Sequence, residues 1–440
     1  MELSTDNSFL HKVGIFVSVI FTSFYFFPFE FKFLPGINTK MAMAGIGLIC
    51  LFFNLAKRRE GFIDNHFFSL SVYALAISFI SYVSVVYNGT NDYSFVGYII
   101  SMWVWVGGAY AWVLWIKQIH GFISVRLIVN YLLTVCTIQC IIAYTINVYP
   151  PLADFVDSFL GGEAFMGKAE GRLYGIGCAL DVSGFRFSAV LVMTTYVCLH
   201  EKAELIRKNI GLYLIGFFVV VIIGNMMSRS TTIGLSIALA YAGYVVLFRK
   251  NEPINSFVFR WFGGILLVGL PVLVYLYNYD EAFYTNIRFG FEGFFSLVEK
   301  GSWEVSSNDI LLDHMIRFPE TLKTWIIGDG YAANPDRDPY YLGPKWHGFY
   351  MATDIGYLRF IFYFGLIGAL AFVVFISKTA FICMKKHPHY KMFFILLLLV
   401  NLIGWFKVTS DIFLMFTPFL CFTQEEESLD GEEETNLIES

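Results

Sequence analysis

Residues 210–248 of the chain read IGLYLIGFFVVVIIGNMMSRSTTIGLSIALAYAGYVVLF. Two apolar runs, near 210–226 and 231–248, are separated by little more than Ser228-Arg229-Ser230. About 20 apolar residues in a row are enough for a helix to cross the hydrocarbon core of a bilayer, which is roughly 30 Å thick. The stretch therefore predicts two membrane-spanning helices joined by a very short connection.

The composition of the whole chain points the same way. Hydrophobic residues make up 57% of its 440 residues, and charged residues make up only 15%. An ordinary soluble domain has about 25% charged residues, so this chain has too few to cover a surface that faces water. The sequence does not show the alternating ten-residue segments of a membrane β-barrel. We therefore expect an all-α polytopic membrane protein.

Apolar runs between charge clusters give twelve candidate spans. The last two are short because Lys407 and Asp411 interrupt them, so ten or eleven full spans with a re-entrant piece is an open alternative. We expect one membrane domain over residues 1–424, followed by an acidic tail, 425–440, of the kind that is usually disordered. The candidate spans lie near 13–28, 38–56, 67–87, 94–116, 125–148, 185–200, 210–226, 231–248, 260–278, 355–377, 391–406 and 410–423.

Lysines and arginines in the short connections predict the orientation. Basic residues favour the cytoplasmic side of a membrane, and here they cluster in alternate connections. Both termini are therefore expected in the cytoplasm, and two longer loops, 149–184 and 279–353, are expected to face outward. The basic clusters are Lys57-Arg58-Arg59, Lys117, Lys202 with Arg207-Lys208, Arg249-Lys250, and Lys378 with Lys385-Lys386.

The first outward loop contains GKAEGRLYGIGCALDVSGFRFSAV, which begins at Gly167 and includes Arg172 and Arg186. Glycines let the backbone approach a ligand closely, which favours a binding site. A tight turn with arginines that reach toward lipid headgroups is equally open. Between the seventh and eighth spans, Arg229 must lie at or just inside the outer boundary. An ionisable residue there is a functional candidate, although it could also reach toward headgroups.

The second outward loop, 279–353, is the one long polar segment, and we call it the long loop. It carries Arg288, His314, Arg317, Arg337 and His347. The pattern predicts a helix capped at Ser306 or Ser307, a break at Pro319, and a second short helix that starts at Pro319 and ends near Gly328.

Within the first of these helices, Asp313 and Arg317 are four residues apart and could pair on one face. His314 and Arg317 could instead present jointly to a ligand. Asp354 stands at the start of the next span.

Several arginines without a pair of catalytic carboxylates indicate an anionic ligand. The planar guanidinium group binds phosphate oxygens in a bidentate manner, and a histidine beside it can move a proton near neutral pH. The seven cysteines show no CxxC pair or metal-type spacing with histidine. We therefore predict no disulfide, metal or other cofactor.

Four patches of the sequence resemble bacterial O-antigen polymerases of the Wzy type and, more loosely, the related O-antigen ligases. They are GRLYGIG (171–177), NMMSRSTTIGL (225–235), RFPETLKTWIIGDGY (317–331) and DIGYLRFIFYFGLIG (354–368). About a dozen spans and a large late outer loop add to the resemblance. It implies a GT-C-like glycosyltransferase of the bacterial inner membrane that acts at the periplasmic face.

The resemblance also implies substrates and residues. Undecaprenyl-pyrophosphate-linked oligosaccharide would be the substrate, and a chain-length regulator and a flippase are the candidate protein partners; no nucleic acid is expected. Polymerases of this family carry an Arg and a Gly with ten residues between them, as do Arg317 with Gly328 and Arg337 with Gly348. Arg172 departs from this spacing, because Ser183 stands where the glycine would. The ligase pattern is best matched by Arg229 and His347.

These considerations give one predicted site. We expect Arg317, His347 and Asp354 to be catalytic, and five arginines to bind pyrophosphate or glycan: Arg172, Arg186, Arg229, Arg288 and Arg337. In this interpretation the long loop is a lid that brings Arg317 and His347 down to a pocket at the membrane boundary. The arginines stabilise the leaving pyrophosphate, and His347 or Asp354 takes the proton of the acceptor hydroxyl without a metal. A ligase, another lipid-linked glycan transferase, and a polysaccharide flippase or transporter are the alternatives.

Overall fold

The computed structural model describes residues 5–56, 65–161, 172–248, 255–335, 341, 343 and 348–423. Within these ranges the chain is mostly helical, and nine helices are long and apolar enough to cross a membrane. The prediction of an all-α multi-pass membrane protein is confirmed at this level. The nine are α1 (Thr5–Phe26), α3 (Asn65–Asn88), α4 (Tyr98–His120), α5 (Val125–Val148), α8 (Leu180–His200), α10 (Ile210–Met227), α11 (Thr231–Phe248), α12 (Phe257–Tyr279) and α17 (Gly356–Lys386).

Three further predicted spans correspond to apolar helices outside these nine. They are α2 (Thr39–Ala56), α18 (Lys391–Gly404) and α19 (Phe413–Leu420). With 8 residues at about 1.5 Å per residue, α19 is too short to cross a bilayer. Helices thus stand at all twelve predicted places, and the two short ones, α18 and α19, are those that Lys407 and Asp411 interrupt. The smaller elements are α6 (Pro150–Phe159), α9 (Ala203–Lys208) and a two-residue antiparallel pairing of β1 (Glu30–Phe31) with β2 (Leu160–Gly161).

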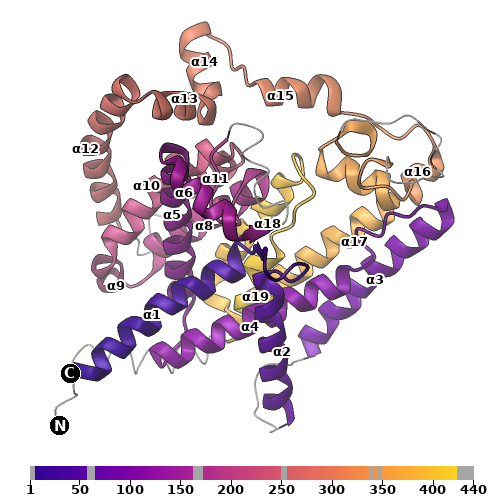
Figure 1. The fold of residues 1–440 in the computed structure, drawn as a ribbon, viewed down its shortest axis with the longest axis horizontal. Helices are drawn as coiled ribbons and strands as arrows, with labels where there is room; N and C mark the ends of the chain where they lie inside the picture. The colour runs from indigo at the N-terminus through magenta and orange to yellow at the C-terminus, as the bar shows by residue number, and fades with distance from the viewer. Residues whose placement is uncertain are drawn as a thin grey trace.

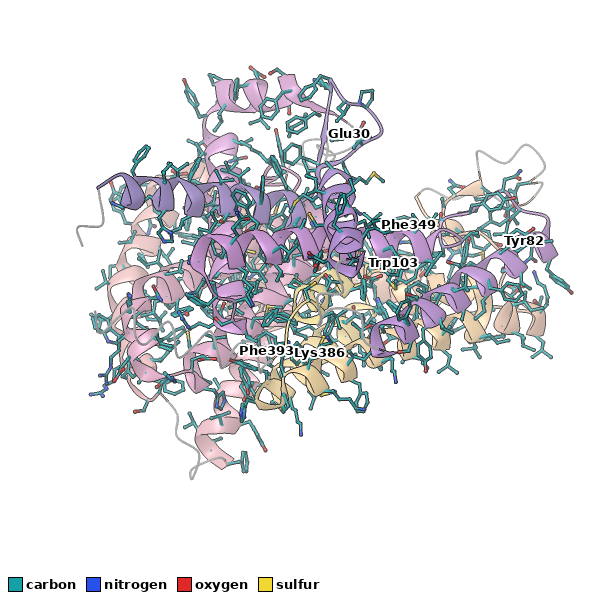
Figure 2. The ribbon with its side chains drawn as sticks, turned by 90° about the horizontal axis from the view of Figure 1, so that it is seen from below. Glu30, Tyr82, Trp103, Phe349, Lys386 and Phe393 are labelled. Carbon is teal, nitrogen blue, oxygen red and sulfur yellow. The ribbon has the colours of Figure 1, made fainter. Side chains whose placement is uncertain are left out.

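Helix α8 is the centre of the bundle, because nearly all of its side chains are buried. It packs against α5, α10, α11 and α18, and Figure 1 shows these helices around it. A Cβ added to Gly234 of α11 would lie 2.2 Å from Cα of Ser188, so α11 approaches α8 as closely as backbones allow. Small residues at such contacts are typical of helix packing in membranes. Side chains fill the spaces between the helices, as Figure 2 shows from below.

The long loop is folded into short helices that arch from the end of α12 toward α17 (Figure 1). It contains α13 (Glu281–Gly290), α14 (Glu292–Lys300), α15 (Ser306–Ile310) with a π-helical turn over Leu311–Met315, α16 (Leu322–Ile326) and a 3-10 turn at Tyr350–Ala352.

Two details of the long loop correct the sequence prediction. The cap of α15 is Val305, without a side-chain hydrogen bond, because the Ser306 hydroxyl instead lies 3.3 Å from Glu292. The second helix begins at Leu322 rather than Pro319, because the Thr321 hydroxyl accepts from the amide of Thr324 and caps it there.

The second half of the long loop is anchored to the bundle. The amides of Asp329 and Gly330 donate to the carbonyl oxygens of Phe362 and Tyr363 in α17. Helix α17 is interrupted at this point, where Gly365 has φ +71 and a Cβ would lie 2.0 Å from the carbonyl oxygen of Ile326. The break lets the loop backbone touch the helix backbone.

Several connections between helices gather on one face of the bundle. Glu30 between α1 and α2 pairs with Gly161, Asn88 at the end of α3 accepts from Lys323 of the long loop, and Arg229 between α10 and α11 contacts Phe289. We call this the loop face. It holds both of the longer loops, 149–184 and 279–353, as far as they are described.

Candidate functional site

Three separate connections meet at Asp181, in the first turn of α8. Its Oδ1 accepts hydrogen bonds from the hydroxyls of Ser228, at 2.9 Å, and Ser230, at 2.5 Å. The Nζ of Lys407, from the connection between α18 and α19, lies 3.4 Å from the same oxygen. A carboxylate is also favoured at the N-terminal end of a helix. Asp181 therefore binds both the turn that carries Arg229 and the side chain of Lys407.

Arg229 points from this turn into the long loop. Its Nε donates to the carbonyl oxygen of Phe289 at 3.0 Å, and its Nη1 lies 3.0 Å from the Ser307 hydroxyl and 2.8 Å from Glu292. Partial burial lowers the pKa of Arg229, and the nearby Arg172 adds to this effect, while Glu292 opposes it. The guanidinium stays charged, because arginine is protonated throughout the physiological pH range.

A second guanidinium faces the same aromatic ring. Arg229 lies 4.2 Å and Arg172 lies 5.1 Å from the centroid of Phe289. The two cations repel each other, and the π-electrons of Phe289 together with the carboxylate of Glu292 offset part of this repulsion. An anion with several oxygens would relieve this repulsion, since guanidinium groups bind phosphate oxygens strongly.

Asp354 lies near this cluster, at the end of the long loop. Its Oδ1 is 3.6 Å from Nη1 of Arg359, and Arg359 stacks on Phe349 at 3.4 Å. Burial raises the pKa of the Asp354 carboxyl; Arg359 opposes the rise, and the nearby charge of Asp181 adds to it. A carboxylate with a raised pKa is suited to taking a proton from a hydroxyl.

Residues with a strained backbone precede both Asp181 and Asp354. Within the described residues, three residues other than glycine have a positive φ: Leu180, Met351 and Ala352. Leu180 immediately precedes Asp181, and the other two precede Asp354 closely. Non-glycine residues in this region are uncommon and cluster at functional sites, where the surrounding structure holds them.

The structure brings only some of the predicted site residues together. Arg172, Arg229 and Asp354 lie at or near the cluster around Asp181. Arg288 is already paired, because both of its terminal nitrogens lie 2.7 Å from the carboxylate oxygens of Glu299 and one of them also donates to Tyr277 of α12 at 3.1 Å. Arg317 is exposed, and its Nε donates to the carbonyl oxygen of His314 instead of pairing with Asp313.

Arg186 lies deeper than expected. Helix α8 begins at Leu180 rather than near residue 185, so Arg186 is about 7 Å further along the helix axis than Asp181. Its side chain is 7% exposed, lies 5.5 Å from the ring of Phe27, and its Nε has no hydrogen-bond partner in the described structure. Arg186 is therefore a buried cation inside the bundle, and it does not reach out to lipid headgroups.

Several predicted residues lie outside the described residues. They are Arg337 and His347 of the long loop, the acidic tail over 425–440, and the basic clusters Lys57-Arg58-Arg59 and Arg249-Lys250. Nothing in the structure bears on them.

The sequence interpretation missed four residues of the cluster. Asp181, Glu292, Lys407 and Arg359 were not among the predicted site residues. Lys407 was noted only because it interrupts an apolar run. A charged residue inside or at the end of a span is a functional candidate in its own right, and that rule applied to all predicted spans would have selected Arg359 and Lys407. Asp181 lies four residues before the predicted start of its span, so no such signal selects it.

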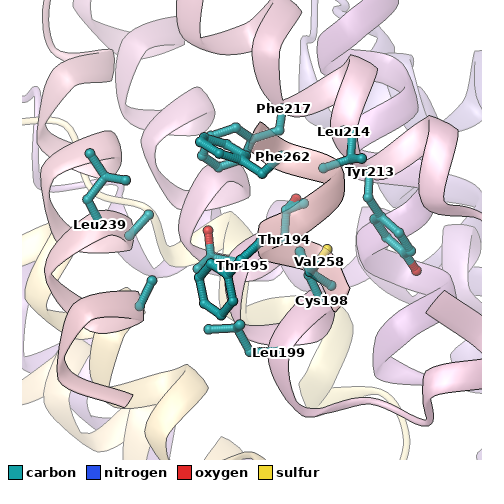
Figure 3. Close-up of a pocket in the computed structure, with 13 residues that line it drawn as sticks. Thr194, Thr195, Cys198, Leu199, Tyr213, Leu214, Phe217, Leu239, Val258 and Phe262 are labelled. Atoms are coloured by element: carbon teal, nitrogen blue, oxygen red, sulfur yellow. The ribbon is translucent and has the colours of Figure 1, made fainter. Parts of the chain in front are cut away.

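An apolar pocket elsewhere does not form part of the site. Figure 3 shows this pocket, of about 130 Å³, between α8, α10, α11 and α12. Its walls include Cys198, Leu199 and Tyr213 and contain no charged side chain. The ends of α8 and α10 that line it are those away from the loop face. It therefore lacks the groups that an anion would need.

Comparison with protein family models, with curated proteins and with solved structures finds no match to this chain.

Proposed function

We propose that the protein is a membrane glycosyltransferase that binds a lipid-linked pyrophosphate at the loop face and transfers the attached glycan to a hydroxyl group. The observation that carries the proposal is the placement of Arg172 and Arg229 around Phe289, beside Asp181, Lys407 and Asp354. The resemblance of four sequence patches to O-antigen polymerases gives the specific form: an enzyme that joins undecaprenyl-pyrophosphate-linked repeat units.

Each part of the cluster has a task in this reaction. The bond between the anomeric carbon and the pyrophosphate oxygen breaks, and the pyrophosphate leaves on its lipid with the electron pair. Arg172, Arg229 and Lys407 stabilise the charge that develops there, and preorganised groups of this kind contribute several kcal/mol. The acceptor oxygen forms the new bond to the anomeric carbon and gives its proton to Asp354.

The position of the cluster at the ends of α8, α10 and α18 fits a lipid-linked substrate. A pyrophosphate attached to a polyprenyl chain lies at the boundary of the hydrocarbon core, because its charge stays in the polar region. Arg172, Arg229 and Lys407 are proposed to lie at this boundary, where their side chains can contact the pyrophosphate. In this proposal the loop face is periplasmic, both termini are cytoplasmic, and the membrane is the bacterial inner membrane.

A deletion strain of the producing bacterium tests the function. We expect lipopolysaccharide with a single repeat unit in place of long chains, and restoration of long chains by the wild-type gene. Lipopolysaccharide without any repeat unit would instead assign the protein as the ligase. Unchanged banding would contradict both.

Point variants test the site in the same strain. Arg229→Ala and Arg229→Lys should both abolish long chains, because a lysine cannot replace the bidentate guanidinium. Arg260→Ala, at the start of α12 away from the loop face, is the control and should leave the banding unchanged. Immunoblotting of membranes must show equal amounts of all variants. Normal banding in both Arg229 variants would contradict the site.

A further inference from the structure

The long loop and Arg229 line an open polar pocket of about 570 Å³ next to the charge cluster around Asp181. It lies between α13, α14 and α15, and its volume is within the usual range of about 300–1,000 Å³ for small-molecule sites. Arg229 and Phe289 form one wall and are shared with the cluster. A ligand whose pyrophosphate contacts Arg229 would therefore place its next chemical group in this pocket. We call it the outer pocket.

The charges of the outer pocket do not favour another anion. Its cationic side chains are each already paired with a carboxylate: Arg288 with Glu299 at 2.7 Å, Arg229 with Glu292 at 2.8 Å, and Lys300 with Glu304 at 2.5 Å. Asp309 adds a further carboxylate to the lining. The lining thus carries one more negative than positive side chain. A second phosphate or an acidic sugar would be repelled.

The same lining suits an uncharged ligand with many hydroxyl groups. Paired carboxylates still have free lone pairs, and guanidinium and serine groups offer further donors. The hydroxyl of Ser306 and the ring of Phe295 also line the outer pocket. A pyranose ring has hydroxyls at its edge and a C–H face that packs on an aromatic ring. Donors, acceptors and an aromatic surface are therefore present together.

We infer that the outer pocket binds the uncharged sugar residue that is attached directly to the lipid pyrophosphate. The inference rests on the proposed function, because that function supplies a ligand with a pyrophosphate next to a sugar. It adds a place for the glycan, on α13, α14 and α15, and a preference for a neutral first sugar. Residues of the outer pocket thus recognise the glycan, and the cluster around Asp181 recognises the pyrophosphate.

Binding measurements with two lipids test the inference. The full-length protein in nanodiscs would be titrated with undecaprenyl pyrophosphate and with the undecaprenyl-pyrophosphate-linked repeat unit extracted from the producing cells. In Phe295→Ala we expect the affinity for the glycosylated lipid to fall about ten-fold, which corresponds to about 1.4 kcal/mol. The affinity for the bare lipid pyrophosphate should change less than two-fold. Asp309→Asn, a milder change, should weaken only the glycosylated lipid, by about three-fold.

The control is Phe294→Ala, on the same helix. Phe294 packs on Trp303 at 4.9 Å and does not line the outer pocket, so both affinities should stay as in the wild type. The sugar-binding role of the outer pocket would be wrong if Phe295→Ala lost affinity equally for the two lipids. It would also be wrong if that variant bound both lipids as tightly as the wild type. Neither outcome would contradict the proposed function. If the wild type bound neither lipid, both proposals would be wrong.

Discussion

Asp181 is the residue on which the arrangement of the site depends most directly. One carboxylate oxygen receives two serine hydroxyls and faces Lys407, so its charge fixes the position of the turn that carries Arg229. Removing one partner of a buried charge pair leaves the other uncompensated, which costs about 3–5 kcal/mol. The side chains of Asp181 and Lys407 are 20% and 26% exposed, so breaking this pair should cost less than that.

We predict that Asp181→Asn reduces long-chain lipopolysaccharide at least ten-fold. The amide oxygen can still accept from the serines, but the ion pair with Lys407 is lost. Band intensities on a gel measure the effect, with membrane levels checked by immunoblot. Asp154→Asn, on the exposed side of α6, is the control. An Asp181→Asn strain with normal chains would show that the ion pair is not needed.

Glu292 pairs with Nη1 of Arg229 at 2.8 Å, so in the proposed site it competes with a phosphate oxygen for this guanidinium. We predict that Glu292→Gln raises the affinity for inorganic pyrophosphate about two- to five-fold, because the ion pair is partly exposed and exposed pairs contribute about 0.2–1 kcal/mol. Isothermal titration of the purified protein measures this. Glu299→Gln, which removes the partner of Arg288 on the same helix, should leave the affinity unchanged. A lower affinity in Glu292→Gln would contradict the competition.

Asp354 should set the acid limb of the pH profile. Burial raises its pKa and Arg359 lowers it, and only the ionised carboxylate can take a proton. The transfer rate should therefore fall as the pH drops through this raised pKa. In Arg359→Gln the opposing charge is gone, so the pKa rises further and the acid limb moves to higher pH. Initial rates across a pH series measure the shift, and an unmoved limb would exclude Asp354 as the titrating group.

At the scale of elements, the contact between α8 and α11 positions the turn over Asp181. Ser188 donates to the carbonyl oxygen of Ser230 at 2.8 Å, and the amide of Gly234 donates to Ser188. A methyl group at Gly234 would meet the backbone of Ser188. The two helices must therefore separate before any side chain larger than hydrogen fits.

We predict that Gly234→Ala destabilises the protein by about 1–3 kcal/mol, the usual cost of overpacking, and also lowers transfer. Thermal unfolding of the detergent-solubilised protein measures the stability. Gly243→Ala is the matched control, because it lies on the same helix and its added Cβ meets nothing within 4 Å. It should be neutral or slightly stabilising, since alanine is the better helix former. Equal melting temperatures for the two variants would contradict the close packing.

At the scale of the whole molecule, the long loop connects the two sides of the bundle. Its first half contacts the cluster through Arg229, and its second half is fixed to α3 and α17 through Lys323 and Asp329. The predicted lid therefore has one contact at the proposed pyrophosphate site and one firm anchor. In the described residues, Arg229 reaches up to the loop, while Arg317 makes only a local contact.

The proposed orientation predicts which residues a reagent can reach from outside. Val298 on α14 is 85% exposed, so a cysteine introduced by Val298→Cys should react with a membrane-impermeant maleimide in intact spheroplasts. Lys208→Cys, at the end of α9, should react only after the membrane is permeabilised. Wild-type protein gives the background from the native cysteines. The opposite pattern would reverse the orientation.

Much of this architecture is predictable from the sequence, because the positions of the helices depend on local properties of the chain. Hydropathy is a property of each segment, so the helices stand at the predicted places and their ends differ by a few residues, as at Leu180. Arg229 was predicted correctly at a helix boundary, because a three-residue connection leaves it no other place. The start of α16 at Leu322 was missed, because the cap by Thr321 depends on one hydrogen bond.

The sequence by itself determined that the chain is a multi-pass helical membrane protein with one long polar loop. It could not determine that Asp181 meets Lys407, because 226 positions separate them and only the packing of α8 against α18 brings them together. The tertiary structure likewise decided that Arg229 and Arg172 share Phe289, whereas Arg317 contacts only the loop itself and Arg288 contacts the loop and Tyr277 of α12. Apolar length is encoded locally, but a charged site at the membrane boundary exists only where separate helices end side by side.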